Sequence, residues 1–97
     1  MGWKIYDEAI LVMQQRFRFF PKVFRWRGQR FEVETVARSW TVLKRGRGWE
    51  RRFFHLRCSS GEFEIYQDIK LGTWHLRRAK LGPERITALR ELQPAWR

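Results

Sequence analysis

Cysteine and histidine, which supply most zinc ligands and many catalytic groups, are scarce in this chain. Only Cys58, His55 and His75 belong to these types among 97 residues, without CxxC or HxxxH spacing. A lone cysteine excludes an intrachain disulfide and fits a reducing compartment. Cys58 falls at an inward position beside a turn, and the histidines fall at outward strand positions with no acid spaced to orient them. The sequence therefore predicts no cofactor, no metal site and no enzymatic activity.

Long apolar runs and glycine-rich phosphate loops are also missing. The longest apolar run, residues 9–13, is far too short to cross a bilayer, and the first residues lack the basic region and apolar run of a leader. Neither GxGxxG nor GxxxxGKS occurs. We expect a cytoplasmic protein without a membrane partner.

Acidic residues are few beside the basic ones. Ten acids face 21 basic residues, which gives a formal net charge of +11. Arginine outnumbers lysine, and its planar guanidinium suits phosphate recognition and stacks on flat rings. The balance favours an anionic partner, nucleic acid first, although a high charge that only maintains solubility is the alternative.

β-Branched and aromatic residues are plentiful, and Gly and Pro divide them into strand-like segments. Six strands are predicted, at about 8–14, 22–28, 30–43 with a bend or bulge near 37–39, 50–58, 62–67 and 73–79. The stretch 8–20 also suits a helix, because Ala, Leu, Met, Gln and Arg favour one. We expect one all-β domain over 1–97: a strongly curved antiparallel sheet or barrel of five to six strands (core about 8–80), then a short helix at about 83–93.

Two tight turns set the expected registers. Gly28-Gln29 as a type II′ turn places Trp26 opposite Phe31, Phe24 opposite Val33, Arg25 opposite Glu32, and Arg27 opposite Arg30 without an acid. Ser60-Gly61 as the second loop places Cys58 opposite Phe63, Arg57 opposite Glu64, Leu56 opposite Ile65, and His55 opposite Tyr66. The same alternation predicts an inner face of Phe24, Trp26, Phe31, Val33, Phe54, Leu56, Phe63, Ile65, Trp74 and Leu76.

The excess positive charge lies toward both ends of the chain and in one internal cluster. If the first and last strands are neighbours, one surface could gather Arg16, Arg18, Arg27, Arg30, Arg77, Arg78 and Lys80. The internal cluster, residues 44–52, alternates Arg and Gly beside Trp49, a stacking platform for a base unless it folds into the core. The candidate nucleic-acid contacts are Arg27, Arg30, Arg45, Arg47, Trp49, Arg77 and Arg78.

Several segments together resemble a known family. They are Phe24-Arg25-Trp26-Arg27-Gly28, Arg30-Phe31-Glu32-Val33, Trp40, Trp49, Arg52-Phe53-Phe54, Phe63-Glu64-Ile65-Tyr66-Gln67-Asp68 and Gly72-Thr73-Trp74-His75-Leu76. This pattern, over about 22–79, resembles small bacterial β domains, and similar segments end proteins related to the Y-family DNA polymerases of the damage-tolerance mutasome. The resemblance implies a compact β domain in a setting of DNA-damage tolerance, and no reaction.

Two functions from different classes follow. The first is a non-enzymatic accessory domain that binds nucleic acid weakly and without sequence preference, through phosphate contacts. The alternative is a protein-interaction module that docks an acidic partner through its C-terminal helix or an open strand edge.

Overall fold

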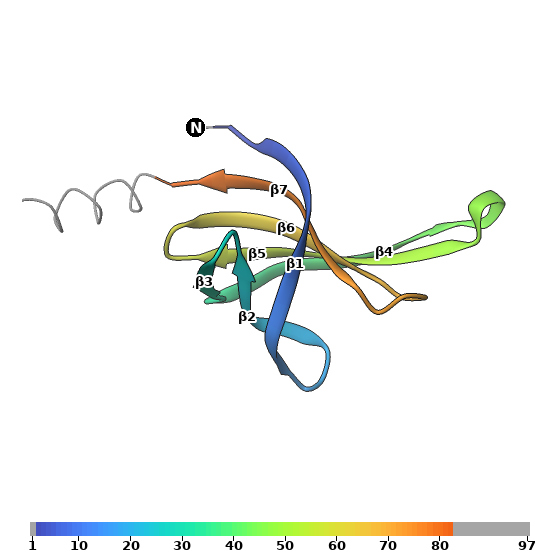
Figure 1. Ribbon diagram of the computed structural model, residues 1–97, viewed down its shortest axis with the longest axis horizontal. Helices are drawn as coiled ribbons and strands as arrows, with labels where there is room; N and C mark the ends of the chain where they lie inside the picture. The colour runs from blue at the N-terminus through green and yellow to red at the C-terminus, as the bar shows by residue number, and fades with distance from the viewer. Residues whose placement is uncertain (1, 83–97) are drawn as a thin grey trace, which may run out of the picture.

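The computed structural model describes residues 2–82, which form a single antiparallel sheet and no α-helix (Figure 1). Its elements are β1 (Lys4–Arg16), β2 (Phe20–Trp26), β3 (Gln29–Glu32), β4 (Thr35–Lys44), the 3₁₀ turn η1 (Arg45–Arg47), β5 (Trp49–Cys58), β6 (Gly61–Asp68) and β7 (Trp74–Leu81). The strand order is β3-β2-β1-β7-β6-β5-β4. The prediction of an all-β antiparallel sheet is confirmed. The sheet is not closed into a barrel.

The prediction of five to six strands is wrong, because the expected segment 30–43 is two strands. Val33 and Glu34 separate them: the Val33 N–H donates to the Lys22 carbonyl at 2.8 Å, and the Glu34 N–H donates to the Arg57 carbonyl at 2.8 Å. The chain thus changes its partner from β2 to β5 within two residues. The expected irregularity near 37–39 is confirmed, since a register shift lies between Val36 and Arg38.

The first segment, for which strand and helix were both open, is the long strand β1. Its first part, from Lys4 to Ile10, pairs with β7, and its second part, from Leu11 to Arg16, pairs with β2. The first and last strands in chain order, β1 and β7, are therefore neighbours in the sheet, as the charge analysis assumed. The helix expected at 83–93 lies outside the described residues.

Both predicted hairpin registers are wrong by one residue in each strand. The first loop is Arg27-Gly28, both with positive φ (51° and 76°), so Trp26 pairs with Gln29 and Phe24 with Phe31. The second loop is Ser59-Ser60. The remaining corrected pairs are Arg25 with Arg30, Cys58 with Gly61, Arg57 with Glu62, Leu56 with Phe63, and His55 with Glu64. Because the slip totals two residues, each side chain keeps its predicted face.

The core therefore matches the expected inner face. Eight of the ten predicted residues are buried, and Val33 and Trp74 are half-buried against the same cluster. Phe63 is in contact with the rings of Phe24, Trp26 and Phe31, with centroids 4.9–6.2 Å apart. This aromatic centre joins the β2–β3 hairpin to the middle of the sheet.

Candidate nucleic-acid interface

The β4–β5 hairpin extends as a two-stranded arm beyond the rest of the sheet (Figure 1). Its tip is η1, Arg45–Arg47, followed by Gly48 in the left-handed conformation (φ 64°), whose N–H donates to the Arg45 carbonyl at 3.2 Å. Gly48 suits this turn because it has no Cβ. Arg45 and Arg47, two predicted contacts, are exposed at this tip.

One face of the arm combines cations and indoles without an acid from either strand. Cross-strand partners lie on the same face, and the partners here are Trp40 with Phe53, Val42 with Arg51, and Lys44 with Trp49. We call this surface the arm face; it consists of Arg38, Trp40, Val42, Lys44, Trp49 and Arg51. Glu50, the only acid on the arm, pairs with Leu43 and so lies on the opposite face.

Guanidinium groups lie over both indole rings of the arm face. The Arg38 guanidinium lies 4.8 Å from the Trp40 ring centroid, and that of Arg51 lies 4.1 Å from the Trp49 ring centroid. Both rings are half-buried. Trp49 is therefore neither a core residue nor a bare platform, the two alternatives left open by the sequence. The Arg51 Nε is buried and has no hydrogen-bond acceptor among residues 2–82.

A row of rings continues from the arm face across four strands of the sheet. Trp40, Phe53, Tyr66 and His75 are direct register partners in sequence on β4, β5, β6 and β7. Successive centroids lie 5.3, 5.1 and 4.8 Å apart, and the first and last pairs are stacked. Phe53 and Tyr66 are buried, whereas the terminal rings are half-buried. Burial raises the pKa of Tyr66, and the positive charge of the nearby Arg51 offsets part of this increase.

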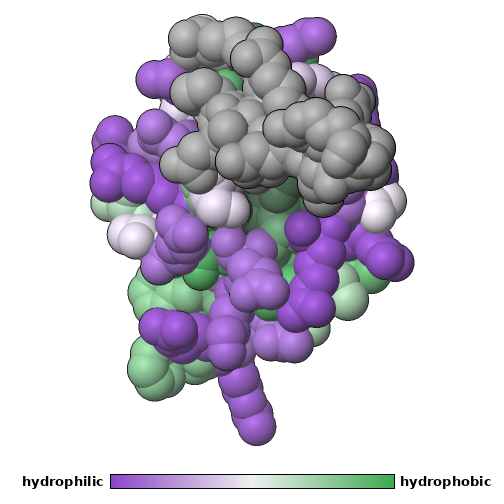
Figure 2. All heavy atoms as spheres, turned by 90° about the vertical axis from the view of Figure 1, so that its left-hand side faces the viewer, coloured by the Kyte–Doolittle hydropathy of each residue, from purple (hydrophilic) through white to green (hydrophobic). Residues whose placement is uncertain are grey.

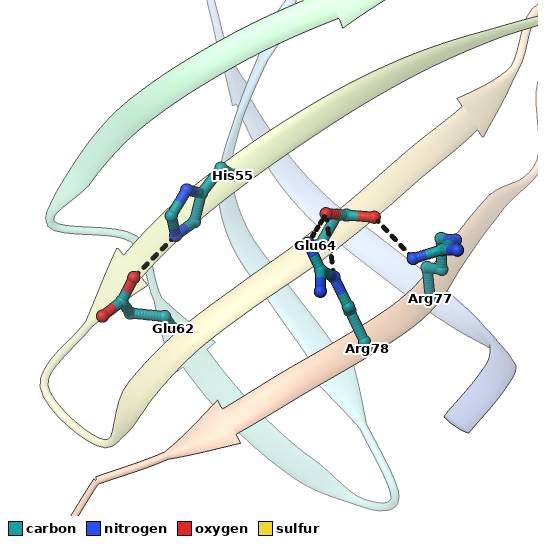
Figure 3. A network of polar contacts seen from close by, with 5 residues as sticks. All are labelled: His55, Glu62, Glu64, Arg77 and Arg78. Atoms are coloured by element: carbon teal, nitrogen blue, oxygen red, sulfur yellow. Dashed lines mark hydrogen bonds and ion pairs between the residues drawn. The ribbon is translucent and has the colours of Figure 1, made fainter. Parts of the chain in front are cut away.

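Glu64 lies on this same outer face and binds two arginines (Figure 3). Arg77 donates to its Oε2 at 3.1 Å and Arg78 to its Oε1 at 3.0 Å, while the Glu64 side chain is only 8% exposed. Consecutive strand residues normally point to opposite faces. Both reach Glu64 because the register passes from Arg78 to Leu76, which leaves Arg77 as the extra residue of a bulge.

The histidines have partners that the sequence did not predict. His55 Nε2 lies 2.6 Å from Glu62 Oε1 on the neighbouring strand (Figure 3), so the expectation that no acid orients it is wrong. The corrected register explains this contact, because Glu62 lies diagonally across from His55 rather than beyond its reach. The other histidine, His75, lies 2.8 Å from the Thr73 hydroxyl.

Glu8 of β1 is a second carboxylate that binds an arginine, and its hydrogen-bond donors are Arg27 and Trp26. The Trp26 indole N–H and the Arg27 guanidinium donate to Glu8 Oε1 at 2.8 and 3.0 Å, and Arg27 also donates to Oε2. The hydrogen bond from Arg27, then that from Trp26, lowers the pKa of Glu8 to about 2. Arg30 lies 3.8 Å from Glu32. The expectation that Arg27 and Arg30 face each other without an acid is therefore wrong.

The structure brings together only part of the predicted site. Arg45, Arg47 and Trp49 share the arm. Arg27 and Arg30 lie in the β2–β3 hairpin, on the opposite side of Figure 1 from the arm tip. Arg77 and Arg78 lie on β7 and are bound to Glu64 of β6. Arg16 ends β1, whereas β7 pairs with the start of that strand, so the terminal arginines do not gather as one surface. Figure 2 views the molecule from the end opposite the arm tip, and its described surface is mainly hydrophilic, with apolar patches.

Sequence reasoning did not name Arg38, Trp40 or Arg51 as contacts, although Arg51 lies in the internal basic cluster, residues 44–52. Trp40 and Phe53 belong to the pattern that resembles a known family but not to the predicted site, although an aromatic residue at an outward position was a usable signal. Phe53 lies next to Phe54, and strict alternation sends one of the two rings outward. The partners of that ring depend on the β4–β5 register, which could not be predicted while residues 30–43 were treated as one strand.

Across residues 2–82, no three His, Cys, Asp or Glu side chains lie together as a metal-binding group. Within the same range, no helix has the length and hydropathy needed to span a bilayer. Cys58 is buried, as predicted, and its burial, followed by the charge of Glu34, raises the pKa of its thiol to about 12.

Comparisons with protein-family models, with curated proteins and with solved structures found no match to this chain.

Proposed function

We propose that this protein is a non-enzymatic accessory domain that binds nucleic acid through the arm. The observation that carries the proposal is the arm face, where Arg38 and Arg51 stack on Trp40 and Trp49 beside Lys44. Proteins that hold nucleic acid without reading sequence combine phosphate-binding cations with rings on which bases stack. The face provides both on one surface.

The distribution of charge supports the arm over the other basic sites. Residues 38–52 carry six basic residues and one acid, a net of +5. Residues 2–82 carry 18 basic and 8 acidic residues, a net of +10, so 15 residues hold half of that surplus. By contrast, Arg27, Arg77 and Arg78 already bind Glu8 and Glu64. A phosphate would have to compete with a carboxylate at those positions.

The setting that we propose for this activity is DNA-damage tolerance. It rests on the resemblance of residues 22–79 to small bacterial β domains and to the ends of mutasome polymerase-like proteins. The binding would be weak, with a Kd of about 10⁻⁴ to 10⁻⁶ M at physiological salt, because phosphate contacts carry it. Such a domain would add local affinity for DNA to a larger assembly.

Titration of labelled single-stranded and duplex DNA, followed by fluorescence anisotropy at about 50 and 200 mM salt, tests the proposal. The test variant replaces Lys44, Arg45 and Arg47 by Gln; a matched control replaces Arg16, Lys22 and Lys70 by Gln and removes the same charge. We expect the arm variant to weaken binding at least about tenfold and the control to change it little. Equal losses in both variants would overturn the arm as the site, and no binding of the wild type at low salt would overturn the function.

A further inference from the structure

A cleft lies at the base of the arm, on the side of β4 that faces away from β5. It has a volume of about 490 Å³ and opens between the β1–β2 turn, the start of β2 and the start of β4. The residues that line it and carry the following argument are Arg16, Phe20, Lys22, Val33, Val36 and Arg38. The size is typical of ligand-binding clefts.

The backbone along this cleft includes an unpaired strand edge. In the described part of the chain β4 pairs only with β5, and it is one of the two ends of the sheet. The pairing between β2 and β3 ends at Val23 and Glu32. Beyond that pair, the hydrogen bond from the Val33 N–H to the Lys22 carbonyl is the last one between the two segments. An edge strand presents N–H and C=O groups on alternate residues, which an added strand satisfies.

The side chains of the cleft combine an apolar floor with a basic rim. Phe20, Val33 and Val36 are half-buried there, and Phe17 at the adjoining turn is 83% exposed. The rim carries three exposed cations, Arg16, Lys22 and Arg38, against one acid, Glu34. A complementary ligand is therefore both apolar and anionic.

We propose that this cleft binds an extended acidic peptide of a partner protein, which adds to the edge of β4 along residues 36–39. Main-chain hydrogen bonds to β4 would hold the peptide, and its alternate side chains would enter the apolar floor or reach the basic rim. The bulge between Val36 and Arg38 limits regular pairing at this edge to a short stretch, which suits a short peptide better than the long edge strand of a second copy. Nucleic acid fits this site less well than the arm face, because the cleft has no indole with a guanidinium over it and its floor combines one ring, Phe20, with two valines.

The probe is a short synthetic peptide that alternates glutamate and valine around one central phenylalanine. It is titrated into the ¹⁵N-labelled full chain while backbone amide shifts are followed. We expect shifts at Lys22 and at residues 36–39, and none at the arm tip, Arg45–Arg47. A control peptide with lysine in place of glutamate should not bind. Equal binding of both peptides, or shifts confined to the tip, would overturn the proposal.

A pair of charge-reversal variants completes the test. Arg16→Glu with Lys22→Glu should weaken peptide binding at least about tenfold, whereas Arg45→Glu with Arg47→Glu, which changes the net charge equally, should leave it unchanged. Equal weakening would overturn the site. Binding that appears only after residues 83–97 are removed would identify that segment as the occupant and overturn a partner peptide. The cleft variant should still bind DNA, so failure of this inference is distinguishable from failure of the proposed function.

Discussion

Removing both arginines from Glu64 should destabilise the protein far more than removing either one. The Glu64 carboxylate is nearly inaccessible, whereas the side chains of Arg77 and Arg78 are 44% and 37% exposed. Breaking a buried ion pair by deleting one partner costs about 3–5 kcal/mol, because a charge is left without compensation. With one arginine deleted, Glu64 keeps the other, so each single Ala variant should lose about 1–2 kcal/mol. The double variant should lose about 3–5 kcal/mol.

The assay is urea unfolding, at neutral pH, of the wild type, the two single Ala variants and the double variant. The change in the free energy of unfolding is calculated from the shift of the transition midpoint, provided that the dependence of that free energy on urea concentration is the same in all four proteins. The same arginine substitutions are then made in a Glu64→Leu background, where no carboxylate remains to be stranded. In that background the double substitution should cost about 1 kcal/mol or less, because a hydrophobic replacement of a buried pair is often neutral. The comparison also cancels the contact of Arg78 with the Trp3 ring, which is present in both backgrounds. Equal costs in the two backgrounds would refute the reasoning.

Three further predictions concern single residues. Gly61→Ala should lose at least about 2 kcal/mol, because its Cβ would lie 2.4 Å from the Lys80 carbonyl oxygen at a φ of 149°, while Gly46→Ala, with open space around it, should be neutral in the same unfolding assay. Cys58 should not react with a thiol reagent in the native protein at pH 8 and should react fully in urea, since burial holds its pKa at about 12; rapid native labelling would contradict this. The pKa of Glu8 is lowered from 4.5 to about 2, so its stabilising effect is complete above 4.5 and is lost as the pH falls toward 2; the stability difference between wild type and Glu8→Gln should disappear across that range.

The predicted core was correct although both predicted turns were misplaced. Moving the loops from Gly28-Gln29 to Arg27-Gly28 and from Ser60-Gly61 to Ser59-Ser60 shifts each pairing by two residues in total. That change preserves the alternation between faces, which follows from the sequence of each strand alone. It changes every cross-strand partner in the two hairpins, so that Glu64 lies opposite His55 instead of Arg57. The two arginines that bind Glu64 come from β7, on the other side of β6. Ion pairs depend on register, whereas burial depends only on which face a residue occupies.

The candidate site was predicted only in part for the same reason. The tip of the arm was accessible to sequence reasoning, since alternating Arg and Gly beside Trp49 is a local signal. The arm face could not be predicted from the sequence. Trp40 is paired with Phe53 because the chain stops pairing with β2 at Val33 and pairs with β5 from Glu34 onward. No local pattern marks that exchange of partners. It becomes visible only in the two backbone hydrogen bonds that separate β3 from β4.

The arginines of this chain divide into classes that its net charge does not distinguish. Arg27, Arg77 and Arg78 are engaged by carboxylates with which a phosphate would compete, whereas Arg38 and Arg51 lie over indole rings. Asp68 is the cross-strand partner of Arg51, but neither arginine forms an ion pair among residues 2–82. Stacking on an indole also restricts a guanidinium, so less conformational entropy is lost when it meets a phosphate. The effective anion-binding surface is therefore smaller than a formal charge of +11 suggests and is best developed where rings and cations share a face. On this chain that condition is met along the arm, which is why we propose nucleic-acid binding there and acidic-peptide binding in the cleft at its base.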